Sequence, residues 1–391
     1  MDYQVSIVGG GITGALLALY LGKAGIKVCL IDKNKPSESI ANPAVGRTAS
    51  LNLSSIETLK EVGVWNIIQQ NSKTFDEIFV WDSEGSSSVQ FKATEISRNN
   101  LGAIVHNNII LEALFKEVKK ISDVHLIEEE SVKNLTDDRD GAVIITESGL
   151  KITSEITVGA DGSLSRIRDL SKMSIRTWSY HQLAIVSSVI TEEPLKGTAY
   201  QIFTDTGPIA LLPLSHEENL ASLIWSTDQS YGEKLLSLDN DSLMYELQLK
   251  TEDRFGAIKL NEEIRSFPLH QLHAKKFFQG RSVLVGDSAH TIHPLAGQGL
   301  NLGIADVKAL AELVIPANRY GKNLYDENIL EAYSKKREPE SYKMIALMEA
   351  FKRGFGSENP WVKLGRNFAF NFAGKAKPLK RRLIKEAAGI I

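Results

Sequence analysis

The stretch best suited to chemistry spans residues 286–303, with the sequence Gly-Asp-Ser-Ala-His-Thr-Ile-His-Pro-Leu-Ala-Gly-Gln-Gly-Leu-Asn-Leu-Gly. Its glycines let a ligand approach the backbone where a Cβ atom would clash. An apolar run at 282–285 precedes it and an apolar run from about 300 to 314 follows, so the pattern predicts a strand, a functional loop and a helix. Free N–H groups at the start of that helix stabilise an anion, or a ring that becomes one. The pattern therefore favours a flat, electron-accepting ligand.

Two histidines in this stretch, His290 and His293, are candidates for catalysis. Their spacing is compatible with metal ligation, but no third ligand is evident, and we expect no metal site. A role in supporting the loop is favoured over proton transfer. No residue is therefore expected to act as a side-chain nucleophile or base.

The N-terminus predicts a dinucleotide-binding βαβ unit. A strand pattern over 3–8, a helix pattern over 15–24 and a second strand pattern over 27–31 follow one another, and the last ends at Asp32. The G-x-G-x-x-G glycines between the first strand and the helix are Gly9, Gly11 and Gly14. In this motif the glycines allow a tight turn, close approach of a pyrophosphate and close packing of helix on strand, and the acid holds ribose hydroxyls. These residues do not decide between FAD and NAD.

Two further stretches place an arginine or an aspartate beside a glycine. Gly46-Arg47 follows the βαβ unit, and Arg47 is either a contact to a phosphate or ring or a surface cation. A later strand pattern ends in Asp161-Gly162, before a basic helix start that contains Arg168. A strand end, a turn and a helix start together suit a phosphate contact.

The composition predicts a two-lobed globular protein. With 391 residues the chain exceeds the usual size of one domain. Hydrophobic residues make up 43% and charged residues 24%, and the net charge of -3 gives no sign of nucleic-acid binding. The single cysteine, Cys29, excludes an internal disulfide and a cysteine-based metal site. No apolar run is long enough to span a membrane, and a strand pattern beginning by residue 3 leaves no room for a leader, so we expect a reducing, cytoplasmic setting.

Strand patterns separate the Asp161 stretch from the Gly286 stretch. They occur at 183–190, 199–203, 209–214 and 220–226, and a hairpin pattern occurs at 75–91. Such segments predict a second, β-rich domain inserted into a discontinuous dinucleotide-binding domain. The predicted limits are 1–72, 100–178 and 268–345 for the dinucleotide-binding domain, 73–99 and 179–267 for the β-rich domain, and 346–391 for a helical, basic C-terminal region.

The C-terminal region has an unusual charge balance. Residues 352–391 contain ten Lys or Arg and two acids, which gives a local charge of +8. Aromatic and aliphatic residues lie among these charges, so the region could contact anionic lipid or an acidic partner. A solvated helix packed on its own domain is an equal alternative.

Taken in chain order, the four stretches resemble the FAD-dependent aromatic hydroxylases of the para-hydroxybenzoate hydroxylase fold. The resemblance runs from about residue 3 to about residue 345. The amino-acid sequence of residues 286–303 is similar to the corresponding sequence of the ubiquinone-biosynthesis hydroxylases. The same similarity is found at residues 101–102, 182–186, 207–214 and 225–226. The resemblance implies a mixed α/β (α+β) fold, with a Rossmann-like FAD-binding domain, an inserted β-sheet substrate domain and a helical C-terminus.

The resemblance also assigns residues to a non-covalently bound FAD. Those implied to hold the ADP half, the pyrophosphate, the ribityl chain and the cofactor near the active site are Gly9, Gly11, Gly14, Asp32, Arg47, Asp161, Gly162, Gly286 and Asp287. Those implied to lie in the loop under the pyrimidine edge of the flavin are Pro294, Gly297, Gln298, Gly299, Leu300 and Asn301.

The activity implied by the resemblance is hydroxylation of the aromatic ring of a polyprenylated phenol in ubiquinone biosynthesis. In such enzymes NADH or NADPH reduces FAD, and O2 then forms a flavin C4a-hydroperoxide that the phenol ring attacks. A ubiquinone-biosynthesis complex is a candidate partner, and the charge of the basic C-terminus makes the inner membrane a candidate for peripheral contact. Two alternatives stay open: a related hydroxylase or epoxidase for another aromatic or apolar substrate, and a non-catalytic subunit of such a complex.

Overall fold

The N-terminal βαβ unit has the form that the glycine spacing predicts. In the computed structural model, β1 (Tyr3–Val8), α1 (Ile12–Lys23) and β2 (Val28–Ile31) follow in order, and β1 and β2 pair in parallel. All four residues of β2 are buried, as in a parallel strand that is covered on both faces. The structure describes residues 2–41, 47–83, 88–138, 141–214, 217–292, 298–355 and 376–390.

The first sheet carries this unit and places several strand ends side by side. Its main path is β18-β19-β11-β1-β2-β8, and the β9–β10 hairpin joins it through β11. From β19 to β8 the strands of this path run parallel, so their carboxyl ends meet at one edge. The further strands are β8 (Val124–Ile127), β9 (Val132–Asp137), β10 (Ala142–Thr146), β11 (Lys151–Gly159), β18 (Phe278–Gln279) and β19 (Ser282–Leu284).

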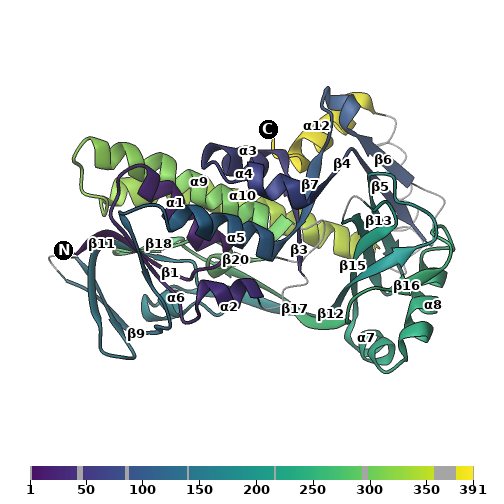
Figure 1. Cartoon of the computed structure of the whole chain (residues 1–391), viewed down its shortest axis with the longest axis horizontal. Coiled ribbons are helices and arrows are strands. Elements are labelled where there is room, and N and C mark those ends of the chain that lie inside the picture. The colour runs from purple at the N-terminus through teal and green to yellow at the C-terminus, as the bar shows by residue number, and fades with distance from the viewer. Residues whose placement is uncertain are drawn as a thin grey trace.

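Helices cover the first sheet on both sides (Figure 1). α1 packs against α5 (Asn107–Val118) and α9 (Gln298–Arg319), and α9 packs against α10 (Glu327–Phe355). α6 (Arg166–Leu170) contacts β9, β11 and β19 from the opposite side. One large hydrophobic cluster joins these layers and fixes α1 and α9 over the sheet.

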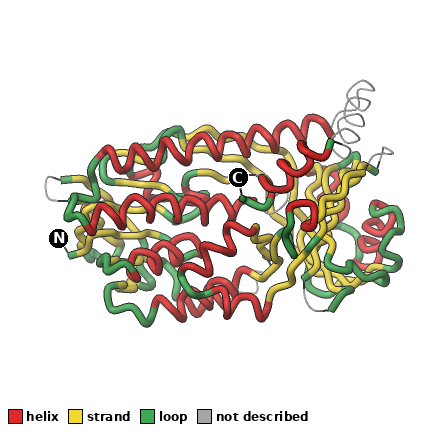
Figure 2. Tube along the Cα trace, turned by 90° about the horizontal axis from the view of Figure 1, so that it is seen from above, coloured by secondary structure: helices red, strands yellow, loops and turns green. Residues whose placement is uncertain are grey.

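The second sheet forms the other half of the elongated molecule (Figures 1 and 2). Its order is β20-β17-β12-β15-β14-β13-β5-β6, with β16 beside β12. Its two longest strands, β12 (Ile175–Thr191) and β17 (Arg265–Ala274), pair antiparallel and connect the two halves. The other strands are β5 (Glu77–Asp82), β6 (Ser88–Lys92), β13 (Thr198–Thr204), β14 (Gly207–Pro213), β15 (Leu220–Asp228), β16 (Ile258–Leu260) and β20 (His290–Thr291).

The two faces of the second sheet meet different neighbours. Ile185, Leu223 and Trp225 belong to a cluster with α7 (Gln229–Leu236) and α8 (Asn240–Lys250). On the other face, residues of β13 and β14 join a cluster with the three-stranded sheet β3-β7-β4 and with α12 (Lys377–Ala387). Figure 1 shows this small sheet between the two large ones. The remaining elements are α2 (Pro36–Ala41), β3 (Thr48–Asn52), α3 (Leu53–Glu61), α4 (Trp65–Ile68), η2 (Gln69–Asn71), β4 (Ser72–Phe75), η3 (Ala93–Ile96), β7 (Gly102–His106) and η4 (Gly286–Ser288).

The fold is the mixed α/β arrangement that the sequence predicts, with helical elements at the C-terminus. The helix expected to end near residue 314 continues to Arg319. Cys29 is buried in β2, and this burial raises the pKa of its thiol to about 12, so it is a packed core residue. The limits given above for the separate domains stay a prediction.

Candidate functional site

Three of the four predicted stretches meet at the carboxyl edge of the first sheet. Leu284 pairs with Gly159, Gly159 with Val8, and Val8 with Ile31, so the four strand ends form one row. The residues that follow these ends are the Gly286-Asp287 loop, the Asp161 turn, the Gly9 turn and Asp32. Ligands of open α/β sheets bind outside this edge.

The first turn of α1 offers free N–H groups to a ligand. Gly9 has φ +109°, and a Cβ atom there would lie 2.3 Å from the Ala160 carbonyl oxygen. A Cβ atom on Gly14 would lie 1.9 Å from the Gly9 oxygen, so both positions require glycine. Gly11 differs, because its Cβ position faces open space and it caps α1 without a side-chain hydrogen bond. The helix N-terminus is therefore uncapped and accessible, which fits an anionic group such as a pyrophosphate.

Asp32 lies next to this turn, where its carboxylate is held in place. Its Oδ2 accepts a hydrogen bond from the Gly10 N–H at 2.5 Å, and its Oδ1 accepts one from the Asn34 N–H at 2.8 Å. The side chain is half-buried. A carboxylate oriented in this way keeps lone pairs free for ribose hydroxyls.

The Gly286 loop lies between the N-terminal ends of α1 and α9. Gly286 has φ +63°, and a Cβ atom there would lie 3.0 Å from Oγ1 of Thr13 in α1. Gly303 of α9 packs on both Thr13 and Gly286. A Cβ atom at Gly303 would lie 3.1 Å from Thr13 Oγ1 and 3.3 Å from Gly286 Cα. The first turns of α1 and α9 therefore approach each other at this loop.

Asp287 lies near Arg47 at the surface of the protein. Its side chain is exposed, yet desolvation by surrounding protein raises the pKa of the carboxyl group, while the charge of Arg47 opposes this shift. The Arg47 guanidinium stacks on Phe267 of β17, with 4.3 Å between its Cζ and the ring centroid. A carboxyl group that is open to solvent on one side and surrounded on the others suits contacts to a bound polar molecule.

The Asp161 carboxylate makes contacts within the protein. It accepts hydrogen bonds from Ser165 Oγ at 2.5 Å, the Arg166 N–H at 2.6 Å and the Ile167 N–H at 3.1 Å. Burial raises its pKa, and these hydrogen bonds act in the opposite direction. The side chain thus caps α6, whereas the Asp161 backbone N–H packs against Gly9. Gly162, with φ +80°, has open space at its Cβ position.

Arg168 joins two of the strand-end turns from inside the protein. It is 4% exposed, and its guanidinium donates to the carbonyl oxygens of Ser288 and Ser163 at 3.1 and 3.0 Å. Ser288 Oγ in turn donates to the Gly159 oxygen at 2.6 Å. The sequence predicted a phosphate contact at the start of this helix. Arg168 instead forms hydrogen bonds within the protein and is part of its scaffold.

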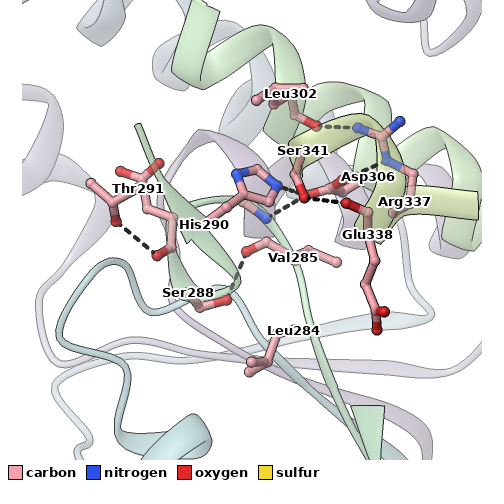
Figure 3. Close-up of polar contacts among 12 residues, drawn as sticks. Leu284, Val285, Ser288, His290, Thr291, Leu302, Asp306, Arg337, Glu338 and Ser341 are labelled. Carbon is pink, nitrogen blue, oxygen red and sulfur yellow. Dashed lines mark hydrogen bonds and ion pairs between the residues drawn. The ribbon is translucent and has the colours of Figure 1, made fainter. Parts of the chain in front are cut away.

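A buried polar network supports the Gly286 loop from the interior of the protein (Figure 3). His290 Nε2 lies 2.6 Å from Asp306 Oδ2, and both side chains are fully buried. The same oxygen accepts the Gly286 N–H at 2.9 Å, while Oδ1 pairs with Arg337 Nε at 2.6 Å. Burial alone would raise the pKa of Asp306, but its interactions with His290 and Arg337 lower it. The ionised carboxylate therefore ties the loop to α9 and α10.

Asp306 and Arg337 are functional residues that reasoning from the sequence missed. Asp306 is the first charged residue of α9, after eight uncharged residues, and this is the one signal that could have identified it. Arg337 lies in a strongly charged stretch of α10 and has no comparable signal.

A second histidine, His273, lies beside this network. It faces His290 across the β17–β20 pair, and its Nε2 lies 2.8 Å from Ser341 Oγ. Burial and the neighbouring His290 lower the pKa of His273 to about 4. It is 1% exposed, so it is a neutral core residue at ordinary pH.

The start of α9 contributes Gly299, Leu300 and Asn301. Gly299 has open space at its Cβ position, and Leu300 packs partly buried on the main core. The Asn301 side chain is used within the protein: it donates to the Ser50 oxygen at 2.7 Å and accepts from the Asn52 N–H at 3.0 Å. The predicted site residues outside the described ranges are Gly46, His293, Pro294, Gly297 and the side chain of Gln298.

The described residues contain neither a candidate metal cluster nor a candidate membrane-spanning helix. No group of three or more His, Cys, Asp or Glu side chains in the described ranges is placed to hold a metal ion. Within the same ranges, no helix combines the length and the apolar character needed to cross a membrane.

Comparison with solved structures defines the class of the fold. A p-nitrophenol 4-monooxygenase from Pseudomonas putida superimposes with a TM-score of 0.81 at 19% identity, over 99% of this chain and 98% of that chain. PqsL from Pseudomonas aeruginosa, solved with 2-aminobenzoylacetate, also gives 0.81 at 19% identity, over 94% of this chain and 99% of that chain. The architecture is thus that of the flavoprotein monooxygenases.

Sequence comparisons identify the family. The family described as FAD binding domain matches residues 2–347. The 3-demethoxyubiquinol 3-hydroxylase of Escherichia coli is 32% identical over 99% of this chain and 98% of its own length. The ubiquinone hydroxylase UbiL of Rhodospirillum rubrum is 30% identical over 99% of this chain and 90% of its own length. The chain belongs to the FAD binding domain family and, within it, to the FAD-dependent ubiquinone-biosynthesis hydroxylases.

Proposed function

We propose that the protein hydroxylates the aromatic ring of a polyprenylated phenol in ubiquinone biosynthesis. It uses non-covalently bound FAD, with NADH or NADPH and O2 as co-substrates. The observation that carries this proposal is the row of four strand ends, which brings the uncapped α1, Asp32 and the Gly286-Asp287 loop to one edge. The names of the relatives supply the substrate class.

The residues at this edge fit FAD. The N–H groups of α1 beside Gly11 suit the pyrophosphate, and Asp32 suits the adenosine ribose. Asp287, whose side chain is exposed, is assigned to the ribityl chain. Gly9, Gly14, Gly286 and the Asp161-Gly162 turn shape the cradle without side chains in it, and Gly299 leaves room at the start of α9. Arg47, which stacks on Phe267, lies near Asp287.

When bound, FAD supplies the redox and oxygen-activating chemistry. The protein's own part is electrostatic and steric. N–H groups in the first turn of α9, together with Gln298, Gly299 and the preceding loop from Pro294 to Gly297, are assigned to the side of the ring that gains negative charge. The reaction also requires that the site exclude water from the reacting atoms.

The inner face of the second sheet is suited to an apolar substrate. Val186 of β12 pairs with Ile224 of β15, and Ile224 pairs with Ala210 of β14, so the three side chains form a row. Val186 and Ile224 are partly exposed. Phe267, on which Arg47 stacks, belongs to the same face through its pairing with Ala184. An aliphatic wall that begins beside the cofactor edge matches an aromatic ring with a long hydrocarbon substituent.

His290 supports the loop in this proposal and transfers no proton to substrate. Its side chain is fully buried and paired with Asp306, away from solvent. His293 is assigned the same supporting role. The predicted domain limits, the cytoplasmic setting with peripheral contact to the inner membrane and the membership of a ubiquinone-biosynthesis complex are part of the same proposal.

Mass spectrometry of quinone intermediates in a strain lacking this gene tests the function. The expected result is a prenylated intermediate that lacks one ring oxygen, and restoration of the quinone by the wild-type gene. Normal quinone content in a deletion strain without a redundant hydroxylase would contradict the proposal. Faster NAD(P)H oxidation with small phenols than with prenylated ones would favour a hydroxylase for another substrate.

A further inference from the structure

A glutamine, Gln201, interrupts the aliphatic wall on the inner face of the second sheet. The row of side chains described above reaches Ala210 of β14. Ala210 pairs with Gln201 of β13, and Gln201 pairs with Val80 of β5, so the row continues across two further strands. Side chains of directly paired residues lie on the same face of a sheet. The Gln201 side chain therefore lies on the same face as Val186 and Ile224.

The Gln201 carboxamide is anchored at one end and free at the other. Its Nε2 donates a hydrogen bond to the carbonyl oxygen of Ile209 at 3.2 Å. The reverse orientation of the amide would place two acceptor oxygens together, so Oε1 is the free end. Oε1 forms no hydrogen bond with the described residues, and the side chain is half-buried. An unpaired acceptor beside apolar side chains favours a ligand that brings a donor to it.

The polypeptide of the cofactor edge contacts this face of the sheet. Thr48, the residue after Arg47, has its Oγ1 atom 2.7 Å from Oγ of Ser222 in β15. Ser222 and Ile224 are two residues apart on one strand, so they point to the same side. Neighbouring strands lie about 4.8 Å apart, which places Gln201 roughly 10 Å from Ile224. An aromatic ring with a hydrocarbon substituent is long enough to contact both residues.

The charge of the row indicates the kind of group that Gln201 would bind. Arg265 of β17 pairs with Val186 and is separated from Gln201 by three strands. From Val186 to Val80 the row contains no charged side chain. An uncharged acceptor in such surroundings suits an uncharged donor, and the hydroxyl group of a phenol is one.

We propose that Gln201 is a substrate-binding residue whose Oε1 accepts a hydrogen bond from a ring hydroxyl of the phenol. The inference rests on the proposed function, which supplies the class of substrate. The ring lies at Gln201, and its hydrocarbon substituent lies on the aliphatic wall. Gln201 thereby determines specificity, because a ring without the hydroxyl leaves Oε1 unpaired in the complex.

Ligand binding to the full-length, FAD-loaded protein tests this inference. A farnesylated phenol is compared with farnesylbenzene, which lacks only the ring hydroxyl, and binding is followed by flavin absorbance without NAD(P)H, so that no turnover occurs. We expect the wild type to bind the phenol roughly tenfold or more tightly than farnesylbenzene, as one hydrogen bond lost to an apolar surrounding implies. Gln201→Met conserves the side-chain volume but has no amide, and we expect it to bind both ligands equally.

Gln90→Met is the matched control. Gln90 is also half-buried in the second sheet, but it pairs with Phe79 on the face covered by α7 and α8, so this variant should keep the preference for the phenol. A wild type without a preference, which no folding defect of a variant can cause, would overturn the inference, as would a preference that persists in Gln201→Met. Neither result alters the quinone content of the deletion strain, so the proposed function is tested separately. A wild type that binds neither lipid would contradict the inference and the proposed function together.

Discussion

At the scale of single residues, the two predicted aspartates of the sheet edge differ in what their carboxylates contact. Asp161 accepts three hydrogen bonds from the start of α6, whereas Asp287 is exposed, and desolvation by the surrounding protein raises its pKa. Among the contacts of the described residues, only the second arrangement leaves carboxylate oxygens free for a ligand. The sequence spacing predicted that both aspartates lie at strand ends. It could not show which of the two carboxylates forms hydrogen bonds within the protein.

Asp287→Ala is expected to weaken FAD retention while the fold stays intact. The carboxylate is exposed, and its ionised form gains little from the protein around it, so the apo chain loses no stability. Flavin absorbance per polypeptide after gel filtration measures the retention, and circular dichroism checks the fold. Asp161→Ala is the comparison, since loss of a helix cap lowers the free energy of unfolding by about 1 kcal/mol. Full flavin occupancy in Asp287→Ala would refute its assignment to the ribityl chain.

His273 is expected to make the protein less stable in mild acid. Its folded pKa of about 4 lies below the unfolded value of about 6.5, so the unfolded chain binds the proton more readily. The contribution is complete above the unfolded pKa and is lost as pH falls from about 6.5 to about 4, by up to ~3 kcal/mol. Urea midpoints across this range should fall less for His273→Gln than for the wild type. His270→Gln on the same strand, where the side chain is exposed, is the control, and identical pH profiles for all three proteins would contradict the account.

At the scale of elements, the βαβ unit and the Gly286 loop were predictable because each glycine sits at a strand end before a helix. The four-strand row follows from parallel pairing, which a sequence pattern can indicate. The Asp306–Arg337 pair was not predictable, since it joins α9 to α10 across 31 residues and depends on how two helices pack. The use of Asn301 inside the protein depended in the same way on the position of β3 and α3.

The glycines of α1 give an element-scale prediction. Gly11→Ala has an ordinary backbone conformation and open space for its Cβ, so the fold should persist while FAD binding weakens by tenfold or more, as about 1.4 kcal/mol of lost contact implies. Gly14→Ala would place its Cβ 1.9 Å from a backbone oxygen and should fail to fold. Flavin titration of the refolded apo proteins, with thermal unfolding alongside, measures both. Unchanged FAD affinity in Gly11→Ala would show that the pyrophosphate does not lie against this turn.

At the scale of the whole molecule, Arg47 lies between two surfaces. One is the carboxyl edge of the first sheet, to which we assign FAD, and the other is the aliphatic face of the second sheet. Arg47 joins them, since it lies near Asp287 and stacks on Phe267 of the second sheet. The sequence predicted two lobes, of which the second is rich in β-strands. It did not predict which sheet face looks inward, because strands buried on both faces lack a clear alternation of polar and apolar residues.

The central claim is that this arrangement inserts oxygen from O2 into the ring of a prenylated phenol. The most direct measurement uses purified, FAD-loaded protein with NAD(P)H, a prenylated phenol and isotopically labelled O2, followed by mass spectrometry of the lipid product. The account predicts a product that carries one labelled oxygen on the ring and that forms in lower yield with Gly11→Ala when FAD is limiting. An unlabelled product, or NAD(P)H oxidation that yields only peroxide with every prenylated phenol tested, would contradict it.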